Sequence, residues 1–299
     1  MKILITGATG FLGRRVCDVL SQAGHTLVAL SRDPQRAKQL VPQLTEVFGW
    51  DALAQALQGC DAVVHLAGET VVGRWTDAKK KAIRDSRVLS TRELVNALAQ
   101  LSIRPKVLIS ASAIGYYGNR GEEPLTEDSS PGSDFLAQVC QDWESEAARA
   151  ESLGIRVVRL RIGLLLGPGG GALQAILPLF KLGLGGPLGL GNQFWSWVHR
   201  DDVVGAIAFA LERDELRGPV NMTAPNPVRQ REFAQVLGRV LRRPAVLLTP
   251  AFALKIVLGE FASELLSSKR VLPQRLHQLG YRFRFAELEP ALREILRVP

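Results

Sequence analysis

Cysteine is scarce in this sequence of 299 residues, which contains only three: Cys17, Cys60 and Cys140. They are odd in number, widely spaced and set among apolar residues, so they do not form a disulfide framework, and their spacing matches no zinc motif. We therefore expect buried free thiols in a protein of the cytoplasm, or of an organelle matrix or stroma if a transit peptide has been removed. The sequence predicts no metal site.

Long apolar runs are also missing. No stretch reaches the roughly 18 uninterrupted apolar residues that a membrane-spanning helix needs. The first ten residues, MKILITGATG, contain one lysine and a short β-branched run that is followed at once by glycine, which is not the pattern of a signal peptide. Since 46% of the residues are hydrophobic, the chain can bury a large core. Because the sequence has no apolar run of the length of a membrane span, we expect no membrane partner.

Acidic residues are fewer than basic ones, which gives a formal net charge of +8. A nucleic-acid partner is one interpretation of this charge, but the basic residues are scattered and their densest run, Lys79–Lys81, falls in a predicted helix. No aromatic residues are interleaved with basic ones as in a base-stacking surface. We therefore expect no nucleic-acid partner and a small anionic ligand, such as a nucleotide, instead.

Short apolar runs alternate with helical patterns through the first half of the chain, which is typical of a doubly wound, parallel α/β sheet. The run Ala62–Leu66 has no polar alternation, as expected for a strand buried on both faces. The predicted strands are Lys2–Thr6, Thr26–Leu30, Glu46–Phe48, Ala62–Leu66, Lys106–Ser110 and Arg156–Ile162, and the predicted helices are Phe11–Ala23, Ala52–Leu57, Lys79–Leu101 and Asp134–Ser152.

The second half has a different composition. Gly167–Gly171 and Gly183–Gly191 are rich in glycine and proline, which predicts loops over a site. We expect a Rossmann-type domain over residues 1–165, rejoined by about 197–222, with residues 166–299 mostly forming a small C-terminal substrate cap. The later predicted elements are helices at Asp201–Glu212, Arg229–Leu241 and Ala251–Leu266 and a strand near Val220–Met222.

The strongest motif is KILITGATGFLG at residues 2–13, where a buried strand is followed by G-x-x-G-x-x-G and an amphipathic helix. Glycine permits the tight turn and lets the backbone approach a pyrophosphate, and the N-terminus of the helix supplies free N–H groups and partial positive charge. The dinucleotide contacts predicted in this motif are Gly7, Thr9, Gly10, Phe11, Leu12 and Gly13.

The end of the second predicted strand indicates which dinucleotide is bound. Ser31 and Arg32 offer a hydroxyl and a guanidinium to a 2′-phosphate, which favours NADP(H). Asp33 is the competing candidate, because a carboxylate on the ribose would select NAD(H). Pro34 predicts a turn that carries Asp33 outward, so the predicted cofactor is NADP(H).

Several segments resemble motifs of the extended short-chain dehydrogenase/reductase superfamily, and the match spans nearly the whole chain. The glycine spacing is one of these motifs, and RVLSTREL at residues 87–94 is similar to the helix motif N-V-x-G-T-x-x-L, with Arg87 where asparagine is usual. The others are HLAG at 65–68, SAS at 110–112 with YYG at 116–118, and WVHRDDV at 197–203.

More narrowly, the chain resembles an atypical subgroup generally called epimerase family proteins, whose substrate is undefined. The segments that carry this resemblance are LAGE at 66–69, RW at 74–75, SR at 86–87, Cys140 with WE at 143–144, KLGLGG at 181–186 and GPVN at 218–221.

The resemblance implies roles for individual residues. Leu66, Ala67 and Gly68 would pass beneath the adenine side of the cofactor, and Arg87 would reach its phosphates or ribose. Ser112 would hydrogen-bond a substrate carbonyl or hydroxyl. The remaining implied contacts are Ser110 and Leu165 to the cofactor, Leu165 along the nicotinamide, and Glu69, Arg74, Trp75, Trp195 and His199 on the substrate side.

One departure from the superfamily affects catalysis. Its Tyr-x-x-x-Lys pair, in which the tyrosine is the general acid/base, should lie about 25 residues beyond Ser112. The sequence there is FLAQVCQDWE, residues 135–144, which contains neither residue. Tyr116 or Tyr117 could replace the missing phenol. The alternative, equally compatible with the sequence, is that the two tyrosines only pack together at a turn. Glu69 is a further candidate, because carboxylates at the ends of parallel strands face the ligand crevice.

Two functions follow from these observations. The first is an NADP(H)-binding oxidoreductase or epimerase-like enzyme that acts on a small polar or nucleotide-linked substrate, with Ser112, Tyr116, Tyr117 and Glu69 as candidate catalytic residues. The alternative is a non-catalytic regulatory protein that senses NADPH and NADP⁺, because the Tyr-x-x-x-Lys pair is absent.

Overall fold

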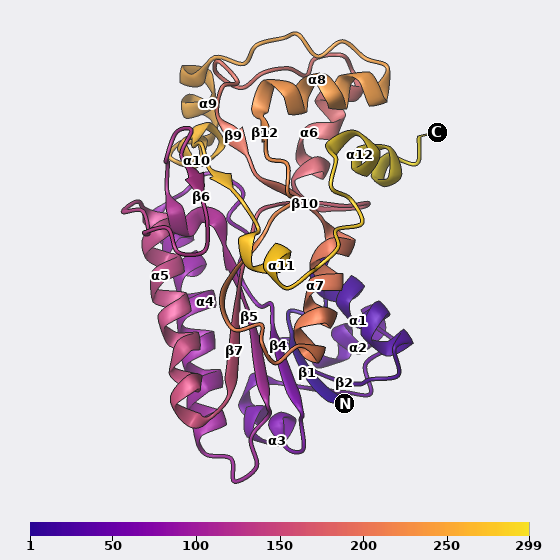
Figure 1. Ribbon diagram of the computed structural model, residues 1–299, viewed down its shortest axis with the longest axis vertical. Coiled ribbons are helices and arrows are strands. Elements are labelled where there is room, and N and C mark those ends of the chain that lie inside the picture. The colour runs from indigo at the N-terminus through magenta and orange to yellow at the C-terminus, as the bar shows by residue number, and fades with distance from the viewer. Residues whose placement is uncertain (299) are drawn as a thin grey trace.

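A seven-stranded sheet with only parallel pairings forms the centre of the computed structural model, which describes residues 1–298 (Figure 1). The strand order is β11-β7-β5-β4-β1-β2-β3. The strands are β1 (Lys2–Thr6), β2 (Thr26–Leu30), β3 (Glu46–Phe48), β4 (Ala62–His65), β5 (Val107–Ala113), β7 (Arg156–Ile162) and β11 (Gly218–Met222).

Helices cover both faces of this sheet because successive strand side chains point to opposite sides. In β1, Ile3 and Ile5 belong to a core shared with α1 (Phe11–Gln22) and α7 (Arg200–Glu212). Leu4 belongs to a second core on the other face, with α3 (Leu53–Leu57), α4 (Asp77–Ala99) and α5 (Phe135–Ala148). The short α2 (Pro34–Leu40) lies beside β3. The predicted doubly wound Rossmann-type fold is therefore confirmed.

A third core holds together the elements beyond the carboxyl ends of the strands, at the top of Figure 1. Its centre contains Phe233 and Trp197, which are almost completely buried. The helices in this part are α6 (Gly171–Lys181), α8 (Gln230–Leu241), α9 (Ala251–Leu258), α10 (Phe261–Leu266), α11 (Gln274–Gln278) and α12 (Leu288–Leu296), and the short strands are β6 (Pro124–Leu125), β8 (Leu164–Leu166), β9 (Phe194–Trp195), β10 (Trp197–His199), β12 (Val228–Arg229) and β13 (Arg270–Val271).

Several elements differ from the sequence prediction, which lacked α2, α11, α12 and the short strands outside the central sheet. The strand expected to end at Ser110 continues to Ala113, so Ser112 lies within β5. The single helix predicted over Ala251–Leu266 is wrong, because Gly259 has φ +61° and separates α9 from α10. Residues between the two glycine-rich segments form α6, which the prediction lacked because Pro178 and the flanking glycines conceal its helical pattern.

The strand order places a crevice beside the glycine turn. After β1 the chain adds β2 and β3 on one side, and β4 then follows on the opposite side of β1. Loops that leave β1 and β4 at their carboxyl ends therefore continue in opposite directions, and ligands of open α/β sheets bind at this reversal.

Close packing in the glycine turn generates a stability prediction. A Cβ on Gly13 would lie 2.1 Å from the Gly7 carbonyl oxygen and 2.8 Å from Ala8 Cα, so backbone would have to move. We expect Gly13→Ala to lower the free energy of unfolding by about 2–3 kcal/mol in urea denaturation without cofactor. Gly10→Ala is the matched control, because its Cβ would be 3.2 Å from the Gly7 oxygen. Equal stability of the two variants would contradict this account.

Candidate functional site

The crevice at the reversal point contains a cavity of about 360 Å³. The glycine turn, the end of β2, the loop after β4 and one face of α4 enclose it. Nine of the predicted site residues line it: Gly7, Thr9, Gly10, Ser31, Arg32, Leu66, Ala67, Gly68 and Glu69. The sequence analysis missed Ala8, Leu30, Ala37, Trp50, Ser86 and Ser90.

The missed residues had partial signals in the sequence. Trp50 comes two residues after β3, and the carboxyl end of every parallel strand meets the same edge of the sheet. Ser86 and Ser90 are four residues apart on the helix that contains Arg87, so they share one helix face.

Backbone contacts join the turn after β1 to the loop after β4. Gly7 has φ +71°, and a Cβ there would lie 2.8 Å from the backbone C and O atoms of Leu66. The Thr6 hydroxyl oxygen accepts hydrogen bonds from the Leu66 and Ala67 amides, each at 3.2 Å. These contacts require glycine at position 7 and fix the two loops relative to each other.

The N-terminus of α1 faces this crevice without a competing acceptor. Gly10 is the N-cap residue, no side chain caps the helix, and the first turn has no acidic residue. The first amides of a helix lack partners within the helix and attract anions. The arrangement suits a phosphate group.

Arg32 and Asp33 have different surroundings although they are adjacent. Arg32 lines the cavity, is exposed, and has no hydrogen-bond or ion-pair partner within residues 1–298. The Asp33 carboxylate accepts a hydrogen bond from the Arg36 amide at 2.9 Å and caps α2, whose first residue is Pro34. Asp33 is therefore engaged by its own helix, as the turn at Pro34 predicts, and the guanidinium of Arg32 is available to a ligand.

Arg87 lies beneath the loop after β4. Its Nη1 donates to the Ile83 carbonyl at 3.0 Å, and its guanidinium carbon is 5.3 Å from the centre of the Trp143 ring. A Cβ on Gly68 would be 3.2 Å from that guanidinium carbon, so the arginine head packs closely against this loop. Burial lowers the pKa of Arg87, and nearby Glu69 opposes this shift. Arg87 therefore packs against the loop that lines the crevice. A direct contact of Arg87 with the cofactor stays a prediction.

Glu69 is at the open side of the crevice. Lys79 donates a hydrogen bond to its carboxylate at 2.9 Å. This hydrogen bond, with the charges of Lys79, Arg32 and Arg87, lowers the pKa of Glu69. The carboxylate is therefore ionised at neutral pH and can accept a proton or a hydrogen bond from a substrate.

Ser112 is part of a buried polar cluster. Its hydroxyl donates to Glu144 Oε1 at 2.7 Å. Arg161 donates to both oxygens of Glu144, at 2.8 and 2.9 Å, and all three side chains are buried. The bidentate ion pair fixes the carboxylate, and the carboxylate fixes the Ser112 hydroxyl.

Tyr117 belongs to the same cluster and is completely buried. Its hydroxyl donates to Asn221 Oδ1 at 2.6 Å, with the Thr126 carbonyl also 2.9 Å away, and it accepts from Arg161 Nη1 at 2.9 Å. Burial raises the pKa of Tyr117 to about 12. The Tyr116 ring lies 3.5 Å from the Arg161 guanidinium carbon. This geometry supports the packed-pair interpretation, and proton transfer by either tyrosine stays a prediction.

Leu136 and Cys140 of α5 have the separation of the superfamily's Tyr-x-x-x-Lys pair, and both side chains serve in packing. Leu136 packs against Gly115, where a Cβ would be 3.3 Å from the leucine Cβ. Cys140 is buried, and burial raises the pKa of its thiol to about 12. The thiol is therefore protonated at neutral pH and serves in packing.

The remaining predicted residues lie outside the cavity lining. The Phe11 ring packs against Gly170, where a Cβ would be 2.4 Å from the ring, and so holds the 167–171 loop. The Ser110 hydroxyl donates to the Ala111 carbonyl at 3.2 Å. His199 caps α7 and lies 3.0 Å from Glu294. Cofactor contacts of Phe11, Leu12, Gly13, Ser110 and Leu165 stay predictions.

No helix in residues 1–298 is long and apolar enough to cross a membrane. In the same range, no three histidine, cysteine, aspartate or glutamate side chains are grouped so that they could hold a metal ion.

The cluster around Tyr117 generates a second prediction. Tyr117→Phe would remove a buried hydroxyl and leave Arg161 Nη1 and Asn221 Oδ1 short of a partner. We expect it to lower the free energy of unfolding by about 1–3 kcal/mol. Tyr116→Phe is the control, because no hydrogen bond of the Tyr116 hydroxyl is found among residues 1–298. A similar loss in both variants, measured by chemical denaturation, would show that the Tyr117 hydroxyl has no such role.

Comparisons with known proteins agree with this geometry. Residues 3–222 match the model of the NAD dependent epimerase/dehydratase family, and residues 249–295 match a domain of unknown function, DUF1731. The chain is 42% identical to the chloroplastic epimerase family protein SDR39U1 homolog of Arabidopsis thaliana, over 99% of this chain and 87% of that protein. It is 38% identical to the epimerase family protein YfhF of Bacillus subtilis, over 99% of this chain and 98% of that protein.

Solved structures give the same result. The crystal structure of human epimerase family protein SDR39U1 with NADPH has a TM-score of 0.92 and 35% identity, and the match covers 99% of both chains. UDP-glucuronic acid 4-epimerase from Bacillus cereus shares the fold, with a TM-score of 0.80 at 19% identity over 99% of this chain and 98% of that chain. Together with the glycine turn and the crevice beside it, these matches show that the chain belongs to the NAD dependent epimerase/dehydratase family.

Proposed function

We propose that this protein binds NADP(H) in the crevice and exchanges a hydride between the nicotinamide and a small polar or nucleotide-linked substrate. The observation that carries the proposal is Arg32, which lines the cavity, has no partner among residues 1–298, and lies next to an aspartate that caps α2. The human relative whose structure was solved with NADPH supports the same cofactor.

Different groups of the chain would hold different parts of the cofactor. The N-terminus of α1 and the backbone at Gly10 would hold the pyrophosphate, and Arg32 would pair with the 2′-phosphate. Leu66 and Gly68 would lie along the adenosine, as members of the cavity lining. When bound, the nicotinamide accepts or delivers a hydride. Nearby Glu69, ionised and on the open side, is the acceptor best placed for a substrate hydroxyl.

Cofactor preference is the direct test of this proposal. A charge-assisted hydrogen bond contributes about 1.5–3 kcal/mol, so one or two from Arg32 would favour NADPH over NADH by roughly 10- to 1000-fold. We expect calorimetric titration to show this preference in the wild type and its loss in Arg32→Ala.

Arg36→Ala is the matched control, because Arg36 is an exposed arginine four residues away that does not line the cavity. Equal affinities of the wild type for the two cofactors, or a preference that survives Arg32→Ala, would overturn the assignment of the 2′-phosphate to Arg32.

A second candidate function is supported by a specific observation. Leu136 and Cys140 of α5 have the separation of the Tyr/Lys pair but cannot transfer a proton as it does, and the Ser112 hydroxyl is already bonded to Glu144. A protein that binds NADPH with these groups closed to substrate would act as a non-catalytic sensor of the NADPH/NADP⁺ ratio.

Deuterated NADPH distinguishes the two candidates. For an enzyme, we expect deuterium to appear in product from a panel of carbonyl compounds and sugar nucleotides. Ser112→Ala or Glu69→Gln should then lower the rate by about 100- to 10,000-fold if that group binds the substrate or accepts its proton. Tight NADPH binding with no transfer across the panel would instead favour the sensor.

A further inference from the structure

One end of the molecule exposes a concentration of large apolar side chains. They belong to the loop after α6, the segment between α8 and α9, and α9 itself, and we call them the apical surface. Each is 52–77% exposed, whereas such side chains are usually spread singly over a protein surface. The apical surface is defined by Leu182, Leu184, Leu190, Val246, Phe252 and Ile256.

Backbone hydrogen bonds show that these segments form one continuous surface. The Leu247 amide donates to the Gly185 carbonyl at 3.3 Å, and the Thr249 amide donates to the Pro187 carbonyl at 2.8 Å. The Gly189 amide in turn donates to the Thr249 carbonyl at 2.9 Å. In Figure 1 the connection from α8 to α9 runs along the top of the molecule, at one end of its longest axis.

Helix α9 presents its apolar residues to solvent. Phe252 and Ile256 are four residues apart and share one face, and both are more than two-thirds exposed. Only Leu254 of this helix is buried. A surface helix of a globular protein normally turns such a face toward the core, so this one lacks a covering layer.

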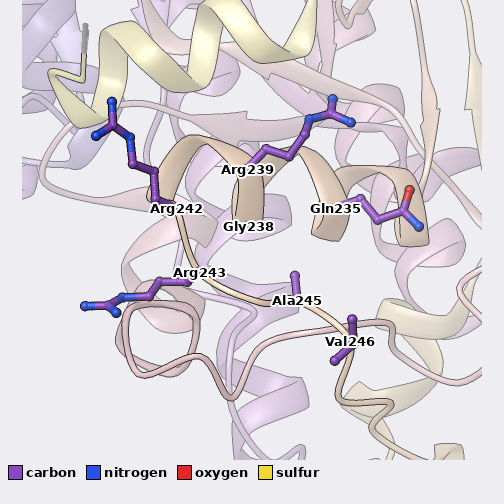
Figure 2. Close-up of a pocket in the computed structure, with 7 residues that line it drawn as sticks. All are labelled: Gln235, Gly238, Arg239, Arg242, Arg243, Ala245 and Val246. Atoms are coloured by element: carbon purple, nitrogen blue, oxygen red, sulfur yellow. The ribbon is translucent and has the colours of Figure 1, made fainter.

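The segments that form the apical surface contain basic residues but no acidic ones. Residues 163–200 and 233–259 contain no aspartate or glutamate, and the second segment contains four basic residues. Arg239, Arg242 and Arg243 surround a pocket of about 440 Å³ whose apolar wall is Ala245 and Val246 (Figure 2). Arg239 pairs with Glu289 at 3.2 Å, but within the described chain Arg242 and Arg243 have no carboxylate partner.

We propose that the apical surface binds an anionic lipid bilayer, in contrast to the expectation from the sequence of no membrane partner. Its aliphatic side chains and Phe252 would enter the boundary between headgroups and acyl chains, while Arg242, Arg243 and Lys255 would contact anionic headgroups. Exposed apolar residues with a basic border and no acidic residue are the features of proteins that lie on a membrane surface.

The observations favour a bilayer over other partners. In a two-fold dimer the same patch meets itself, which would place these arginines against one another without acidic residues to neutralise them. Protein interfaces are enriched in aromatic residues, methionine and arginine, whereas the exposed apolar side chains of this surface are leucine, valine, isoleucine and a single phenylalanine. This inference does not depend on the cofactor or on catalysis.

Flotation with vesicles tests the proposal on the full-length protein. We expect the wild type to float with vesicles of equal parts phosphatidylglycerol and phosphatidylcholine, not with phosphatidylcholine alone, and to be released by salt. The double variant Phe252→Asp/Ile256→Asp should lose binding. Arg242→Glu/Arg243→Glu should weaken it at least about tenfold, since each basic residue near an anionic surface contributes about fivefold.

Matched controls lie elsewhere on the surface. Ile103→Asp changes an isolated apolar residue that is 82% exposed between α4 and β5, and Arg282→Glu reverses an exposed charge outside the apical surface. Both should bind anionic vesicles like the wild type. Thermal melting and NADPH titration establish that each variant is folded, with Leu182→Asp as the substitute for the α9 variant if that one is unstable.

Three outcomes would overturn the proposal. The wild type could fail to bind anionic vesicles, or the apical variants could bind as well as Ile103→Asp. Sedimentation velocity could also show a wild-type dimer that Phe252→Asp dissociates, in the absence of vesicle binding. That third result would assign the surface to a second copy of the chain.

Discussion

The close contact between the turn after β1 and the loop after β4 is the constraint on which the crevice depends. It needs a left-handed residue at Gly7, no side chain at Gly13, and a hydroxyl at Thr6 that accepts from two amides of the neighbouring loop. His65 adds to this junction, because its Nδ1 is 2.7 Å from the Thr6 hydroxyl and its Nε2 is 2.9 Å from the Thr91 hydroxyl of α4. These contacts therefore fix β1, β4, α1 and α4 relative to one another without any group from a ligand.

The candidate cofactor-binding groups and the candidate catalytic groups differ in whether they already have protein partners. The groups proposed to bind the cofactor, the N-terminus of α1 and Arg32, face the crevice without protein partners in the described chain. Ser112 and Tyr117, in contrast, have their hydroxyls bonded within a buried cluster that contains the ion pair of Glu144 and Arg161. Removing one partner of a buried ion pair typically costs about 3–5 kcal/mol because the other charge is left buried without compensation, so Glu144 and Arg161 depend on each other.

Local patterns in the sequence were sufficient to predict the sheet and the glycine turn. Buried parallel strands are short apolar runs, and the six strands predicted from such runs are all present. The outward turn of Asp33 also follows from the proline next to it. The cluster around Arg161 could not be found in this way, because Tyr117 and Asn221 are 104 residues apart in sequence and meet only because β5, β7 and β11 are neighbours.

Packing on α5 restricts how the chemistry of this chain could have changed. Restoring the superfamily's pair would need tyrosine at Leu136, which is packed against Gly115, and lysine at the buried Cys140. A lysine ammonium there would sit one helical turn before Glu144 and compete with Arg161 for its carboxylate. The two arrangements thus exclude each other, and exchanging one for the other would require changes in the helix, the ion pair and the end of β5 together.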